Sequence, residues 1–356
     1  MGAPEVRWEF GLGYGTAALV LLALPQLASL LLEPPLLLLA DRVPRKPLIV
    51  GGLALLGGCF VLAGAAASLP LLALALAVAG PAGGAGVGLA QATLVDARPD
   101  ERERVMARWA LMGTLGDLAT PLLLAGLAAL AMGWREAYLA AGSLFLLYAL
   151  ALLPCRFPSP RAGPPHGSPP LRELVLGAAR NRRLLLWLLG VSLCGMLDET
   201  LVAFAALRMD ALGLETAQRN LVLFCFAAGG LGGLLVTERL LRREPPLRLL
   251  RRAGALCAIS YVAWLAAPGV VAGAVLLTAV GFFAAPLYPI AKAQAYRALP
   301  DHSGLVAGAA QLFTPVELAV PLVVGLLADR LGLSAALAVL VVQPLGLLAL
   351  GVVLDR

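Results

Sequence analysis

Charged residues are scarce in this chain of 356 amino acids: they make up 13% of it, whereas 60% of the residues are apolar. The mean hydropathy is accordingly high, at +0.89. A water-soluble domain has about a quarter of its residues charged and about half of them apolar. The shortage of charge therefore excludes an ordinary soluble protein. It predicts an all-α membrane protein that crosses the lipid bilayer many times.

Histidine is scarce as well, and cysteine is never spaced as in a metal site. The two histidines, His166 and His302, lie far apart, and the five cysteines form no Cys-x-x-Cys pair. A metal centre needs several such ligands together. No nucleophile–base pair and no phosphate-binding motif is recognisable either. We therefore expect no metal, no cofactor and no enzymatic activity.

Long apolar segments are what the chain has in abundance. Each is close to the about 20 residues that a helix needs to cross a bilayer. They predict eleven transmembrane helices, over residues 13–40, 48–67, 70–95, 105–131, 136–154, 184–207, 220–241, 253–267, 270–292, 304–328 and 334–354.

The net charge of +6 does not predict nucleic-acid binding, because the cations lie in short connections between the apolar segments. They crowd alternate connections, beginning with Arg42, Arg45 and Lys46, and are few in the others. Basic connections stay in the cytoplasm. We therefore expect an inner (plasma) membrane protein with its C-terminus in the cytoplasm and its N-terminus outside.

Weak internal repeats occur in the same order in both halves of the chain. Residues 126–137, GLAALAMGWREA, are echoed by residues 325–336, GLLADRLGLSAA, and the turn at Asp41 and Arg42 is echoed by Glu238 and Arg239. Such repeats are typical of transporters. The second half has one apolar segment more, so the pattern predicts a six-plus-six protein whose first helix is absent from this sequence. A misassigned start codon and a real truncation are both open as explanations.

The repeat predicts three regions: a helical bundle over 1–154, a cytoplasmic linker over 155–183 and a second bundle over 184–356. The linker is rich in proline, which favours extended chain. From Leu171 to Arg183 it reads as a short amphipathic basic helix. We expect such a helix to lie on the inner leaflet of the membrane, held there by electrostatic attraction to anionic lipids. A regulatory docking site is the alternative.

In its layout of apolar segments, linker and charged turn, the chain resembles the major facilitator superfamily of secondary transporters. Asp41, Arg42, Arg45 and Lys46 match the charged positions of the family's loop signature, G-x-L-x-D-R-x-G-R-K/R, and Gly133-Trp134-Arg135 resembles the entry to its sixth helix. Leu37 and Pro44 stand where that signature has glycines. The resemblance implies two bundles, alternating access and inner-face charges that act as a latch. We expect the run Arg98–Arg104 to pair with the Asp41 turn, and a solvated turn is the alternative to a latch.

Two features of the family's drug/proton antiporters are missing. Gly80–Gly84 occupies the region of the fourth-helix arginine, and Gly116-Asp117 replaces the Gly-Pro signature of the fifth helix. We therefore do not expect a proton antiporter of that standard design.

Five acids fall deep inside the apolar segments, where each costs about 3 kcal/mol and so calls for a reason. The pattern shows no lysine or arginine at comparable depth, since Lys292 is taken as the end of its segment. Asp117 and Glu317 are related by the repeat and fall near the midplane, where transporters place their binding sites. The candidates for substrate or proton binding, with one amide as a further hydrogen-bond donor, are Glu33, Asp117, Asp198, Glu199, Glu317 and Gln311. The alternative is that protonated acids only join helices.

Together these observations predict a secondary transporter that moves a small organic solute by alternating access. A proton gradient as the driving force is a hypothesis that the unpaired acids motivate. The alternative function is a receptor or assembly partner that descends from a truncated transporter and no longer transports.

Overall fold

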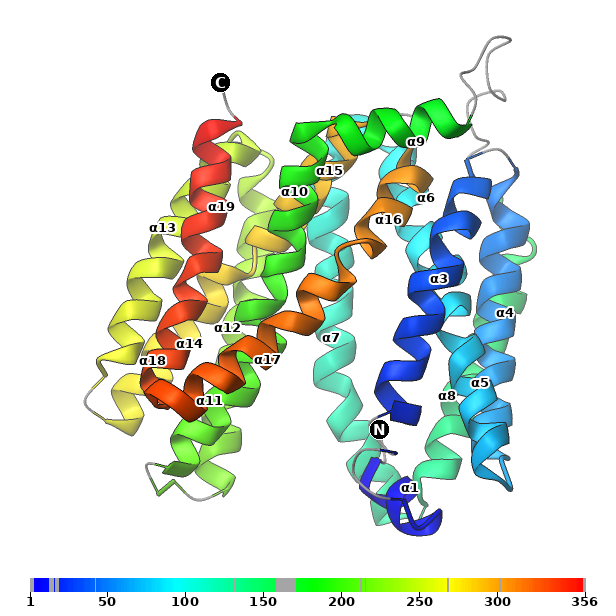
Figure 1. Cartoon of the computed structure of the whole chain (residues 1–356), viewed down its shortest axis with the longest axis horizontal. Helices are drawn as coiled ribbons and strands as arrows, with labels where there is room; N and C mark the ends of the chain where they lie inside the picture. The colour runs from blue at the N-terminus through cyan, green and yellow to red at the C-terminus, as the bar shows by residue number, and fades with distance from the viewer. Residues whose placement is uncertain are drawn as a thin grey trace. The chain divides into compact units, whose positions relative to one another are not determined.

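The computed structural model describes residues 3–12, 16, 19–41, 43–130, 132–157, 171–211, 213–214, 216–267, 269–300 and 302–354. Within those ranges, helices and short turns account for all of the regular structure (Figure 1). The contacts group the chain into two compact units. Unit 1 comprises Met1–Ala97, Ala119–Leu176 and Asp301–Leu312, and unit 2 comprises Arg98–Leu118, Gly177–Pro300 and Phe313–Arg356.

Unit 1 contains a short N-terminal helix and a set of long apolar helices. Its elements are α1 (Ala3–Glu9), the π-helical turn η1 (Leu19–Ala23), α3 (Leu24–Leu39), α4 (Arg45–Gly64), α5 (Leu69–Gly83), η2 (Gly84–Gly88), α6 (Leu89–Ala97), α8 (Trp134–Leu152), α16 (Ser303–Gln311) and the second part of α7 (Arg102–Ala129). The amphipathic helix predicted in the linker is α9 (Leu171–Arg180), which crosses from unit 1 to unit 2. The prolines before it lie outside the described residues.

Unit 2 contains the first part of α7 and the long helices of the second half. Its elements are η3 (Pro99–Glu101), α10 (Arg182–Leu193), η4 (Cys194–Leu197), α11 (Glu199–Ala211), α12 (Thr216–Leu240), α13 (Pro246–Leu265), α14 (Val270–Ala284), α15 (Leu287–Ala298), α17 (Thr314–Leu331), α18 (Leu333–Ala338), η5 (Val339–Val341) and α19 (Val342–Val353). Asn181 caps α10, because its side chain accepts a hydrogen bond from the Leu184 amide at 3.1 Å.

Among the described residues, nine helical segments are long and apolar enough to cross a membrane. The helices α7, with 28 residues, and α13, with 20, are also long enough to cross a bilayer. With these two, the described part of the chain has the eleven long helices that the apolar segments predict. The predicted division into 1–154 and 184–356 stays a prediction.

Glycine allows the helices of each unit to approach closely. In unit 1, a Cβ on Gly57 would lie 2.8 Å from the Gly142 carbonyl oxygen, so α4 and α8 touch through their backbones. In unit 2, Gly233 of α12 meets the backbone of α14 at Phe282 in the same way. Contacts between small residues are the usual means of packing helices in lipid, where apolar side chains gain little by leaving the solvent.

Three long segments of the second half are broken near their middle. The segment Arg182–Met209 is interrupted by η4 and by Asp198, whose φ of −113° and ψ of −94° are not helical. Pro286 separates α14 from α15, and Leu312 and Phe313 separate α16 from α17, which begins with Thr314 and Pro315. A proline removes a helical hydrogen bond and disfavours helix in the residue before it. These breaks place polar residues at the ends of half-helices.

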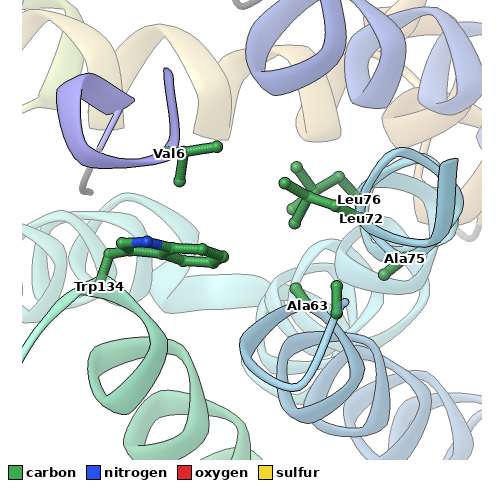
Figure 2. Close-up of a cluster of buried hydrophobic side chains, with 7 residues drawn as sticks. Val6, Ala63, Leu72, Ala75, Leu76 and Trp134 are labelled. Carbon is green, nitrogen blue, oxygen red and sulfur yellow. The ribbon is translucent and has the colours of Figure 1, made fainter. Parts of the chain in front are cut away.

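The helix α1 is held against the end of unit 1 by a small apolar cluster (Figure 2). Val6 is 1% exposed and packs with Trp134, Leu72 and Leu76. Glu9 adds polar contacts, since its carboxylate accepts hydrogen bonds from Trp134 Nε1 at 2.8 Å and from Arg135 Nη2 at 2.6 Å. The cluster therefore ties the chain before α3 to the ends of α4, α5 and α8.

Candidate functional site

Four of the predicted acids belong to unit 2, where they form what we call the acid cluster: Asp117 of α7, Asp198, Glu199 of α11 and Glu317 of α17. All four side chains are exposed. Asp198 is close enough to Glu199 and Asp117 for like-charge repulsion, and Glu317 repels Glu199. The structure therefore brings together carboxylates that are up to 200 positions apart in the sequence.

The helix breaks explain how carboxylates come to lie inside apolar segments. Glu199 is in the first turn of α11, and Glu317 is in the first turn of α17. The free amide groups and the dipole of a helix N-terminus stabilise negative charge. A half-helix that starts inside the membrane therefore offers an acid a favourable position that a continuous helix would not.

Lys292 is the functional candidate that sequence reasoning missed. Its side chain is 8% exposed, and it lies in α15 within the candidate span Val270–Ala298. It interacts electrostatically with Glu317, and its Nζ lies 5.8 Å from the centre of the Tyr296 ring. The expectation that no cation lies at the depth of the acids is therefore wrong. The cause is that the apolar segment was ended at Lys292, whereas the helix continues for six further residues to Ala298.

Glu33 and Gln311 are brought together in unit 1. Glu33 is 5% exposed, and its carboxylate accepts hydrogen bonds from Gln311 Nε2 and from the Ser29 hydroxyl. Gly84 lies directly against this carboxylate, so any larger residue there would collide with it. These contacts favour a helix-joining role for Glu33, which was the alternative considered for it.

The loop signature is built around Asp41, which binds the start of α16 in unit 1. Its two carboxylate oxygens accept hydrogen bonds from the Gly304 and Leu305 amides, each at 3.0 Å, and one also pairs with Arg45 at 2.8 Å. Burial raises the pKa of the Asp41 carboxyl, against the opposing effects of Arg45 and the two amides. The arrangement joins the α3–α4 turn to a helix more than 260 positions away in the sequence.

Arg45 and Lys46, two further charges of the signature, make additional contacts within unit 1. Arg45 forms a second ion pair with Asp96 at 2.7 Å, and Lys46 donates to the Leu153 and Cys155 carbonyl groups at 2.6 Å and 2.9 Å. Arg42 lies outside the described residues. The signature thus acts as a set of fixed ties between turns and helix ends.

In the repeat copy of the signature, Glu238 is paired and Arg239 is exposed. Glu238 accepts from Arg108 of α7, with an oxygen–nitrogen distance of 2.7 Å, and from Arg242 at 3.5 Å. Both pairs lie within unit 2. The copy therefore ties α12 to α7.

The acidic run before α7 makes two kinds of contact within unit 2. Glu101 pairs with its neighbour Arg104 at 2.6 Å. Glu103 is 4% exposed and accepts hydrogen bonds from Gln294 at 2.9 Å and Arg297 at 3.0 Å. These contacts hold the start of α7 against α15, the helix that carries Lys292. Pairing of this run with the Asp41 turn stays a prediction.

Metal binding finds no support in this arrangement. Among the residues that the structure describes, no three or more histidine, cysteine, aspartate or glutamate side chains are grouped as a metal ion would require.

Known proteins resemble this chain in sequence and in fold. The chain is similar to the chloramphenicol resistance protein of Streptomyces lividans, with 26% identity over 262 residues, which cover 73% of this chain and 66% of that protein. The chain thus spans just under two thirds of the length of this curated relative.

Solved structures share the fold. The transporter FucP in its outward conformation superposes with a TM-score of 0.82 at 16% identity, covering 99% of this chain and 93% of that one. A variant of the Escherichia coli fucose:proton symporter FucP gives a TM-score of 0.80 at 15% identity, with coverage of 100% and 95%. The human organic anion transporter MFSD10 gives 0.71 at 18% identity, with coverage of 98% and 88%.

The sequence profile described as the Major Facilitator Superfamily matches residues 3–316, nearly the whole chain. This match agrees with the loop signature, the eleven long helices and the superposition on transporters of the same superfamily. The chain belongs to the Major Facilitator Superfamily of membrane transporters.

Proposed function

We propose that this protein is a secondary active transporter that moves a small organic solute by alternating access, and that the acid cluster lies on the path of the solute. The observation that carries the proposal is the exposure of all four carboxylates in segments that are long enough to span the membrane. Facing lipid, each would cost about 3 kcal/mol. Facing water, the same side chains cost little, so the surface that carries them belongs to an aqueous path.

The broken helices support the same proposal. Irregular backbone at membrane depth is tolerated where it is buried in protein or lines a water-filled cavity. In transporters, interrupted helices form the sites for solute and coupling ion. Asp198 sits directly at such an interruption, and Glu199 and Glu317 begin the half-helices that follow.

Proton coupling is the second part of the proposal. Within the described part of the chain, none of the four carboxylates forms an ion pair, and all four are open to solvent. Asp117 and Glu317 are the pair we assign to coupling, because the repeat relates them. We place the protein in the plasma membrane. The distribution of Lys and Arg along the chain indicates that its C-terminus lies in the cytoplasm.

The test is solute uptake into proteoliposomes driven by a pH gradient, using a panel that includes chloramphenicol and L-fucose. The double variant Asp117→Asn with Glu317→Gln should lose gradient-driven accumulation while it keeps exchange of solute across the membrane without a gradient. Asp329→Asn, an exposed acid at the far end of α17, is the matched control and should behave like the unaltered protein.

Two results would contradict the proposal. Undiminished coupling in the double variant would remove the role of the two acids. Binding of solutes without any flux, in any variant, would instead favour the alternative of a receptor that no longer transports.

A further inference from the structure

Lys292 carries an ammonium group to which the described part of the chain supplies no hydrogen-bond acceptor. It is 8% exposed, and in the ranges that the structure describes its Nζ has no hydrogen bond and no carboxylate within ion-pair distance. Its described interactions are with the Tyr296 ring, whose centre lies 5.8 Å from Nζ, and with the charge of Glu317, which lies beyond ion-pair distance. An ammonium group has three N–H groups to satisfy. The Lys292 side chain is mostly buried, but its Nζ is not among the fully enclosed atoms that lack a hydrogen-bond partner, so a ligand that supplies acceptors can reach it.

The surroundings of Lys292 do not suit a ligand with only negative charge. The acid cluster contributes four carboxylates against this single cation, and Glu317 lies close to both Lys292 and Glu199. A simple organic anion approaching Lys292 would be repelled by these carboxylates. A simple organic cation would be attracted to the acids but would leave the ammonium group without an acceptor. Only a ligand with both charges satisfies the whole group.

We propose that the transported solute is zwitterionic: an anionic group such as a carboxylate binds Lys292, and an amine binds the acid cluster at Asp198, Glu199 or Asp117. The inference rests on the proposed transport function and names the substrate class of the same site. Its structural basis is the combination of one recessed cation with several exposed acids on broken helices. The charges of the site orient the ligand: its anionic end lies toward α15, and its amine lies toward α11 and α7.

A purely structural role for Lys292 makes a different prediction. If the side chain only neutralised Glu317 and packed on Tyr296, its replacement would lower the stability of the protein without changing its preference among ligands. The two roles are therefore separated by ligand selectivity rather than by stability or expression.

The experiment compares four probes on one carbon scaffold, measured by isothermal titration with the purified full chain in detergent. Phenylalanine is the zwitterion, phenylalaninamide the cation, phenylpropanoate the anion and phenylpropanamide the neutral member. Aminohexanoate, hexylamine, hexanoate and hexanamide repeat the comparison with the two charges further apart. The variants are Lys292→Gln, Lys292→Arg and, as a control, Arg243→Gln, an exposed cation in the turn between α12 and α13.

We expect a zwitterion to bind at least about tenfold more tightly than the matched cation, anion and neutral probe. Lys292→Gln should remove that advantage without weakening the binding of the cation, whereas Lys292→Arg should retain part of it and Arg243→Gln should have no effect. The inference is overturned if neither zwitterion is preferred, which includes the case that no probe binds, or if the preference survives in Lys292→Gln. Flux of neutral or cationic solutes in the proteoliposome assay would then leave the transport function standing, so the two failures are distinguishable.

Discussion

The docking of α1 offers a quantitative comparison between apolar packing and an ion pair at one site. Val6 is 1% exposed inside its cluster, so Val6→Ala removes two buried methyl groups. At about 0.8 kcal/mol for each, with a further contribution from the cavity, the loss is about 2 kcal/mol. The Glu9–Arg135 pair is more open, with side chains 42% and 29% exposed. Exposed ion pairs contribute about 0.5–1 kcal/mol, so Glu9→Gln should cost less than Val6→Ala.

The assay is hydrogen exchange at the Phe10 and Leu12 amides, which donate to the Val6 and Arg7 carbonyl groups at 3.1 Å and 2.9 Å. These bonds are lost when α1 opens, so their exchange reports the opening equilibrium. We expect Val6→Ala to speed exchange about thirtyfold and Glu9→Gln about twofold to fivefold, since 1.4 kcal/mol is a factor of ten.

Trp8 supplies the control, because it lies on the same short helix but is 78% exposed. Trp8→Ala should leave the exchange rates nearly unchanged. The reasoning is refuted if Glu9→Gln speeds exchange more than Val6→Ala, or if neither substitution has an effect. Either result would show that the apolar packing of Val6 is not the main interaction that holds α1 in place.

Three further predictions follow from other contacts. Hydrogen bonds from Arg135 and Trp134 lower the pKa of Glu9 below 4.5, so its contribution to α1 docking is complete above that pH and is lost as the pH falls through the lowered value. Exchange of the Phe10 amide at a fixed intrinsic rate should therefore be constant from pH 7 to 5 and rise in stronger acid; a rise already near neutral pH would contradict this. Glu103→Gln weakens the tie to Arg297 and should cost about 1–3 kcal/mol, seen as faster exchange along α15, and unchanged exchange there would disprove the tie. Gly142→Ala should lower the thermal midpoint of the purified protein, because the new methyl group would lie 2.7 Å from a carbonyl oxygen of α4; an unchanged midpoint would show that the helices part without cost.

Long helices were predictable from the sequence, and their ends and interruptions were less so. An apolar run of about 20 residues has one stable form in lipid, because every backbone group must be bonded within the segment. The α15 helix shows the limit of this reasoning. Its apolar run stops at Lys292, but the helix continues through Gln294 and Arg297, whose side chains are satisfied by Glu103 from a distant part of the chain.

The acids were recognisable because charge is rare in such segments, but their grouping was not. Asp198 lies near Asp117 and Glu33 binds Gln311 through contacts that span 81 and 278 positions, respectively. No periodicity within one helix encodes such pairs. The short helix α1 escaped prediction for another reason: seven residues do not form a stable helix alone, and it depends on Val6 packing against distant helices.

The central claim is that the acid cluster meets water inside the membrane. The most direct test of this claim is to label single cysteines with a charged, membrane-impermeant thiol reagent, in a protein whose five native cysteines have been replaced. We predict that Asp117→Cys, Asp198→Cys and Glu317→Cys react, since the reagent requires a hydrated thiolate, and that Ile259→Cys on α13, which is 66% exposed and apolar, does not. Equal protection of the three acid positions and Ile259 would contradict the account.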